Sequence, residues 1–62
     1  MVALTSKQQQ VCDLVARGFS NKEIARKLGI GVRTIEGHRK CIYDKMGVRN
    51  AVELVRKLLG AE

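Results

Sequence analysis

The sequence predicts an all-α protein, a four-helix bundle that forms a single domain over residues 1–62. Proline is absent from the chain, and no stretch alternates apolar and polar residues as a half-buried strand would. Three glycine-containing breaks, at 18–20, 29–31 and 47–50, interrupt segments whose apolar residues recur at helical spacing. The four helices are therefore expected at about 5–17, 21–28, 32–46 and 51–59.

The first two predicted helices share one start signal. Thr5 and Ser20 are each followed, three residues later, by a residue that can complete a capping box, Gln8 and Glu23. A glycine then ends each segment. The residues expected to face inward are Leu4, Val11, Leu14 and Val15 in the first helix, and Ile24, Ala25 and Leu28 in the second.

The third predicted helix is the longest, and its cap is weak. Gly31 occupies the cap position, where it offers no side-chain oxygen, and Gly47 stops the helix. The last helix begins with Asn50 followed by Glu53, and Gly60 closes it. The residues expected to face inward are Ile35, Ile42 and Met46 in the third helix, and Ala51, Leu54, Val55 and Leu58 in the last.

Positive charge is concentrated in the middle of the chain. The formal net charge is +6, and residues 22–49 hold eight Lys or Arg against three acids. A polyanion such as nucleic acid selects this pattern, although a solvated basic face gives it too. A membrane partner is not expected, because the chain has one Phe, no Trp and no apolar run of spanning length. A cytoplasmic location is expected.

The residues capable of covalent or metal chemistry are few and scattered. Cys12 and Cys41 are too few for a disulfide framework and are not spaced as a metal knuckle. His38 lacks an accompanying nucleophile or paired carboxylates, and Tyr43 is expected at a half-buried edge of its helix. The sequence therefore predicts no enzyme activity, no metal and no cofactor.

The second and third segments have the outline of a helix-turn-helix. A turn of about three residues containing glycine joins them, and the second of the two is long and basic. Ala25 is small where two helices would cross closely, Gly29 lies at the turn, and Ile35 anchors the next helix. These positions would set the angle between the two helices.

Four stretches carry a family resemblance: LTSKQQQV at 4–11, GFSNKEIARKLGI at 18–30, RTIEGHRKCIYDKMGV at 33–48 and RNAVELV at 49–55. Across nearly its whole length the chain resembles the C-terminal DNA-binding domain of LuxR/FixJ-type (NarL- and GerE-like) transcription regulators. The resemblance implies a third helix in the major groove of double-stranded DNA, a weak homodimer formed through the last helix, and two half-sites. It also implies response-regulator control by a separate domain, with RNA polymerase as a further candidate partner.

The resemblance assigns roles to individual residues. Base-reading positions fall at Arg33, Glu36, Gly37 and Lys40. Phosphate contacts fall at Asn21, Lys22 and Thr34 by similarity, with Arg39 and Lys45 added from their charge and helix face. The dimer contact would use Val52, Val55, Arg56 and Leu59, which do not all fit into one small core.

Gly37 departs from the family pattern, in which a larger side chain is common. Glycine inside a helix costs about 1 kcal/mol relative to alanine. Close approach of the backbone to bases would explain it, and simple tolerance of glycine at an exposed position is the alternative. A rival function also stays open, a protein-interaction module or small stand-alone regulator that acts by mixed dimerisation. Under either function the chain is expected to be either a complete small protein or a domain excised from a longer one.

Overall fold

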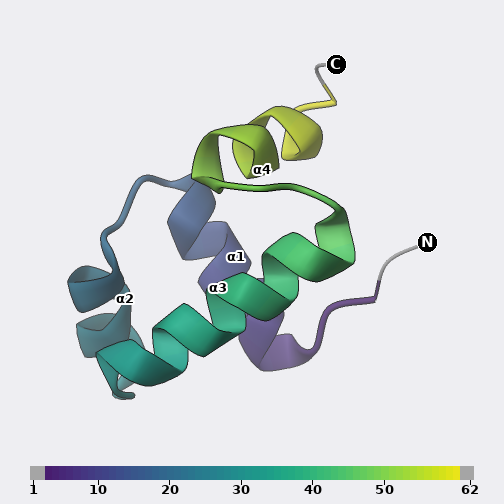
Figure 1. The fold of residues 1–62 in the computed structure, drawn as a ribbon. Helices are drawn as coiled ribbons and strands as arrows, with labels where there is room; N and C mark the ends of the chain where they lie inside the picture. The colour runs from purple at the N-terminus through teal and green to yellow at the C-terminus, as the bar shows by residue number, and fades with distance from the viewer. Residues whose placement is uncertain (1–2, 61–62) are drawn as a thin grey trace.

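A computed structural model describes residues 3–60, and these residues form four helices and no strand (Figure 1). They are α1 (Ser6–Ala16), α2 (Asn21–Leu28), α3 (Val32–Met46) and α4 (Ala51–Leu58). The predicted all-α class and all four helices are confirmed. The first helix is one residue shorter at each end than expected, because Thr5 is its extended N-cap and Arg17 its C-cap. The last ends one residue early, with Leu59 as its C-cap.

The α1 and α3 helices together form the centre of the arrangement, and α1 packs on all three other helices. The α3 helix crosses α1 and packs on both α1 and α2, while α4 packs on α1 (Figure 1). All four helices contribute to one core, whose buried residues are Val11, Cys12, Val15, Ile24, Ala25, Ile35, Ile42 and Leu54. Because α2 and α3 share this core, their relative orientation is fixed by apolar packing rather than by the turn alone.

One residue predicted to face inward does not. Leu58 keeps 44% of its surface exposed, although Leu54, one helical turn earlier, is fully buried. Leu58 lies in the last turn of α4, where the helix has run past its cover. The two cysteines also differ from one another. Cys12 is in the core, where burial and then the charge of Asp13 raise the pKa of its thiol, whereas Cys41 is exposed.

The predicted start signals are present with one change. Thr5 with Gln8 and Ser20 with Glu23 both form complete capping boxes. At the last helix the Glu53 N–H donates to the Asn50 side chain at 2.9 Å, but the Glu53 carboxylate accepts from the Arg49 N–H at 2.8 Å instead of closing the box. The start of α4 is therefore capped from two successive residues.

The predicted stop signals act through backbone conformation. Gly29 and Gly47 follow α2 and α3 with φ of 69° and 70°, in the left-handed region that favours glycine. At Gly29 the following N–H, of Ile30, donates back to the Ala25 carbonyl at 3.1 Å. This bond reverses the chain directly into α3 and keeps the connection between the two helices short.

Candidate functional site

The helix-turn-helix pair positions one face of α3 outward. Ile35 and Ile42 are fully buried on its inner side, against Ile24 and Ala25 of α2 and the core of α1. Residues that lie about half a turn away from Ile35 must then point to solvent. All four predicted base-reading residues are on this outer side, and Arg33, Glu36, Gly37 and Lys40 are all exposed. We call these four residues the α3 outer face.

The α3 outer face makes no internal polar contacts. Within residues 3–60 none of its side chains takes part in a hydrogen bond with another part of the protein. At Gly37 a side chain would meet no atom within 4 Å, and the backbone there does not have positive φ. Neither space nor conformation inside the protein therefore requires glycine at this position, and the donors and acceptors beside it are free to bind a ligand.

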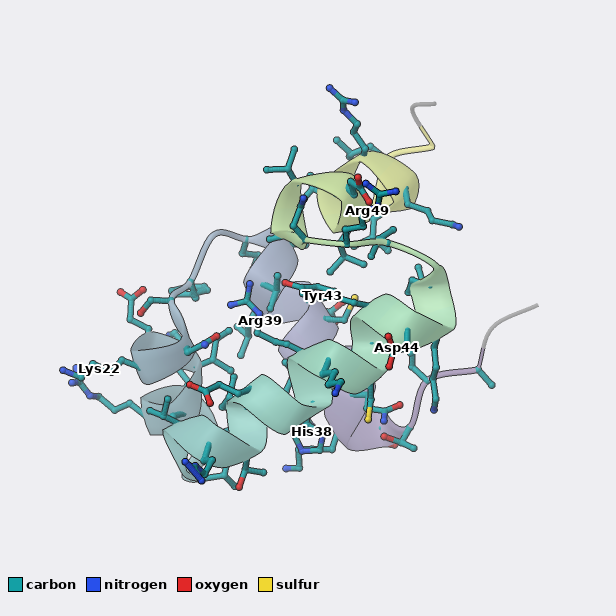
Figure 2. All side chains as sticks on the ribbon, in the orientation of Figure 1. Lys22, His38, Arg39, Tyr43, Asp44 and Arg49 are labelled. Atoms are coloured by element: carbon teal, nitrogen blue, oxygen red, sulfur yellow. The ribbon has the colours of Figure 1, made fainter. Side chains whose placement is uncertain are left out.

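Two predicted phosphate-contacting residues flank this face and are also exposed. Thr34 lies in the first turn of α3, and Lys22 lies on the outer side of α2 (Figure 2). Arg33 and Lys40 of α3 are exposed as well. Positive charge, which the sequence concentrates in residues 22–49, is thus present on the surface that the helix-turn-helix presents.

Asn21 and Arg39, which are both predicted to contact phosphate, are hydrogen-bonded to each other. Arg39 is half-buried, and its Nη1 donates to Asn21 Oδ1 at 2.5 Å. Its Nε and Nη2 donate to the Tyr43 hydroxyl at 3.0 and 2.6 Å, and Figure 2 shows Arg39 and Tyr43 on the same side of α3. This cluster links the start of α2 to the middle of α3.

Lys45 is likewise bound within the protein. Its Nζ donates to Gln8 Oε1 at 2.9 Å and to the Ala3 carbonyl at 3.4 Å. The same Gln8 oxygen also accepts from the Thr5 N–H at 3.1 Å, so a buried glutamine joins the cap of α1 to the C-terminal half of α3. Sequence reasoning identified Gln8 as a capping residue but missed this second role.

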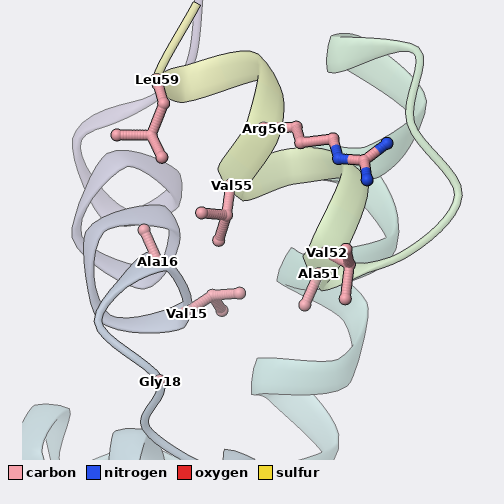
Figure 3. A pocket seen from close by; sticks show the side chains of 8 residues that line it. All are labelled: Val15, Ala16, Gly18, Ala51, Val52, Val55, Arg56 and Leu59. Carbon is pink, nitrogen blue, oxygen red and sulfur yellow. The ribbon is translucent and has the colours of Figure 1, made fainter. Parts of the chain in front are cut away.

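The exposed side of α4 forms a shallow apolar groove with the end of α1. The groove has a volume of about 370 Å³, and all four predicted dimer-contact residues line it (Figure 3). Its lining consists of Val15, Ala16, Gly18, Ala51, Val52, Val55, Arg56 and Leu59. Val52 and Leu59 are 67% and 78% exposed. The contribution of Ala16 of α1 and of Gly18, which follows α1, was not predicted, because a helical period describes one helix and not its neighbour.

Residues 3–60 contain no group of three His, Cys, Asp or Glu side chains placed to hold a metal ion. None of the helices described is long and apolar enough to cross a membrane.

Comparison with known proteins identifies the fold family. Residues 2–58 match the model of the family described as "Bacterial regulatory proteins, luxR family". Among curated proteins, the chain is 44% identical over 54 residues to the tetrathionate response regulatory protein TtrR of Salmonella typhimurium, a match that covers 87% of this chain and 26% of TtrR. It is 42% identical over 55 residues to the transcriptional regulatory protein UhpA of Escherichia coli, covering 89% of this chain and 28% of UhpA.

A third relative is the oxygen regulatory protein NreC of Staphylococcus aureus, 39% identical over 56 residues, with 90% of this chain and 26% of NreC covered. The chain thus spans about a quarter of the length of the curated relatives that it matches. No solved structure matches it.

Proposed function

Because the chain belongs to the luxR family of bacterial regulatory proteins, a DNA-binding and non-enzymatic family, we propose that residues 1–62 form the sequence-specific output domain of a transcription regulator. In this proposal α3 lies in the major groove of double-stranded DNA. The observation that supports it is the α3 outer face, which is exposed and has no hydrogen-bond partner for its side chains within residues 3–60. A helix that presents both hydrogen-bond donors and an acceptor suits the major groove, because each base pair presents a distinct pattern of donors and acceptors there.

Each residue of the α3 outer face has its own role in the recognition of bases. Arg33 and Lys40 donate to guanine O6 and N7, and Glu36 accepts from the cytosine amino group. Gly37 lies between them without a side chain, so the helix backbone approaches the base edges closely there. Contacts of this kind specify sequence, and each good pair discriminates against the wrong base by about 1–3 kcal/mol.

Phosphate contacts set the register of α3 in the groove. Lys22 and Thr34 are exposed on both sides of the turn and contact the backbone directly. Asn21 and Arg39 act from the cluster that they form with Tyr43. Lys45 contacts phosphate only after its ammonium leaves Gln8 and Ala3, so its contribution to affinity is the smallest of the five.

A homodimer forms through the groove of α4, with Val52, Val55, Arg56 and Leu59 at the contact. The surface is small, so the dimer is weak unless DNA or an attached domain holds two copies together. In a longer parent chain the attached domain is the regulatory one, and RNA polymerase is a further partner at the promoter. The relatives named as regulatory proteins, about four times as long as this match, support that arrangement.

The exposed groove of α4 also favours a second candidate function, a protein-interaction module or small regulator that forms mixed dimers with related chains. Fluorescence anisotropy with a labelled random-sequence duplex, at several salt concentrations, separates the two. DNA binding predicts affinity that falls steeply with salt, and Lys22→Ala or Lys40→Ala each weaken it. Lys22→Ala, which removes a phosphate contact, also reduces the slope of log affinity against log salt by about 0.9.

The interaction-module function predicts that both lysine variants are neutral, and that Val52→Asp or Leu59→Asp abolishes capture of the partner chain. Absence of duplex binding by the wild-type chain even at low salt would contradict the DNA-binding proposal. If the wild-type chain does bind, selection from a pool of duplexes supplies the preferred sites on which variants of the α3 outer face are compared.

A further inference from the structure

In the cluster of Arg39, Asn21 and Tyr43, the donors and acceptors that are already used limit what the cluster can bind. A guanidinium can only donate, so the Asn21 atom that faces it must be the carbonyl oxygen. The Asn21 amide NH₂ is thereby turned away from Arg39. The Tyr43 hydroxyl accepts two bonds from the same guanidinium, which leaves its hydrogen as the remaining polar group it can use.

Neither of these donors is used inside the described protein. Within residues 3–60 the Tyr43 hydroxyl and the Asn21 amide donate to no acceptor, and both side chains are half-buried rather than covered. The cluster therefore has unused donors at the start of α2 and in the middle of α3, on side chains that are partly exposed. Its complement is a ligand atom that only accepts hydrogen bonds, and a phosphodiester oxygen is such an atom.

We propose that Arg39 is a positioning residue which orients the Asn21 amide and the Tyr43 hydroxyl as donors to a backbone phosphate of bound DNA. This proposal rests on the proposed DNA-binding function and adds Tyr43 to the phosphate-contacting residues. In this proposal Arg39 contributes mainly through the planar, forked shape of its guanidinium and less through its charge. The guanidinium holds an acceptor atom of α2 and one of α3 at the same time. Lysine has the same charge but lacks this fork.

Two conservative variants test the proposal. Tyr43→Phe removes the hydroxyl and keeps the ring, and Arg39→Lys keeps the charge and removes the fork. Binding of a labelled mixed-sequence duplex is measured by anisotropy over a range of salt concentrations. We expect each variant to bind roughly 3- to 10-fold more weakly at every salt concentration, the effect of losing a hydrogen bond. The salt slope should stay unchanged, because no charge is lost.

The double variant should bind no more weakly than the weaker single variant, since both substitutions remove the same contact. Gln9→Ala is the matched control, because it also removes one side-chain hydrogen bond, the 3.0 Å bond from Gln9 to Asp13 on α1; it should bind as the wild type does. The unfolding temperature of each variant is determined by circular dichroism, and binding is measured well below it. Loss of fold then does not contribute to the measured loss of affinity.

The outcomes distinguish this proposal from the one on which it rests. If the wild-type chain binds the duplex and Tyr43→Phe binds equally well, the phosphate contact is overturned while DNA binding stands. If Arg39→Lys binds as the wild type does, or the two losses add in the double variant, the positioning role of Arg39 is overturned. If the wild-type chain binds no duplex at all, both proposals fail together.

Discussion

At the scale of single residues, Gly37 is the position where the protein and its proposed ligand make opposite demands. A methyl group there would meet no atom of the protein within 4 Å, so Gly37→Ala should stabilise the free chain by about 1 kcal/mol through helix propensity alone. That would raise the unfolding temperature by roughly 4–8 °C for a domain of this size. Duplex binding should weaken at the same time, because the methyl group holds the backbone away from the bases.

Thermal unfolding followed by circular dichroism, together with anisotropy, checks both halves of the Gly37 prediction. Gly47, the C-cap of α3, provides the control. Its φ is 70°, so its replacement by alanine should destabilise the chain. A Gly37→Ala chain that is more stable and binds DNA equally well would mean that glycine is merely tolerated there. The prediction of close approach would then be wrong.

The residue scale also shows where sequence reasoning stops. The exposure of Arg33, Glu36, Gly37 and Lys40 follows from helical periodicity once Ile35 is placed in the core, so it could be predicted. The bond between Lys45 and Gln8 joins residues 37 positions apart, and no local pattern encodes that distance. Tyr43, by contrast, lies four residues after Arg39, a spacing that brings side chains together on a helix, so its role could have been found.

At the scale of elements, the start of α2 gives the domain a dependence on pH. The Glu23 carboxylate accepts a bond from the Ser20 N–H at 2.8 Å, and this bond, followed by the bond to the Ser20 side chain, lowers the pKa of Glu23 from its ordinary value of 4.5. A lowered folded-state pKa means that the stabilisation is present above the unfolded pKa and is lost as pH falls through the folded pKa. Stability should therefore decline on acidification below about pH 4.5.

Unfolding midpoints measured between neutral and acid pH, for the wild type and for Glu23→Gln, check this dependence. Glutamine retains the capping geometry and cannot titrate, so its curve should be flatter in the acid range. Ser20→Ala, which removes the cap itself, should cost about 1 kcal/mol near neutral pH. Parallel curves for the wild type and Glu23→Gln would show that Glu23 does not carry the acid dependence.

The four helices could be predicted well because residues close in sequence determine where each helix begins and ends. The capping boxes at Thr5 and Ser20 and the left-handed glycines at 29 and 47 act within one turn of the chain. The exposure of Leu58 could not be predicted, since it depends on how far the neighbouring helix extends. A helical period places Leu58 on the same side as Leu54, but only the packing of α4 on α1 shows that cover ends between them.

At the scale of the whole molecule, the two proposed functional surfaces lie on different helices, so they can be altered separately. In the proposed function the α3 outer face reads one half-site, and a second copy binds at the groove between α4 and α1. Val52→Asp or Leu59→Asp should leave the monomer folded, because both side chains are largely exposed already, 67% and 78%. The same change should prevent the dimer, because it would bury a carboxylate in an apolar contact.

Duplexes with one and with two copies of a selected half-site give the readout. Both variants should bind the single-site duplex as the wild type does, while their affinity for the two-site duplex falls to the single-site value. The wild type gains there because the first bound copy raises the effective concentration of the second. Val32→Asp is a useful contrast, since Val32 is exposed to 37% but lies at the start of α3 and should weaken both duplexes equally. Equal losses for Val52→Asp and Val32→Asp on both duplexes would mean that α4 supports the fold or the DNA contact, and not a two-fold contact between copies.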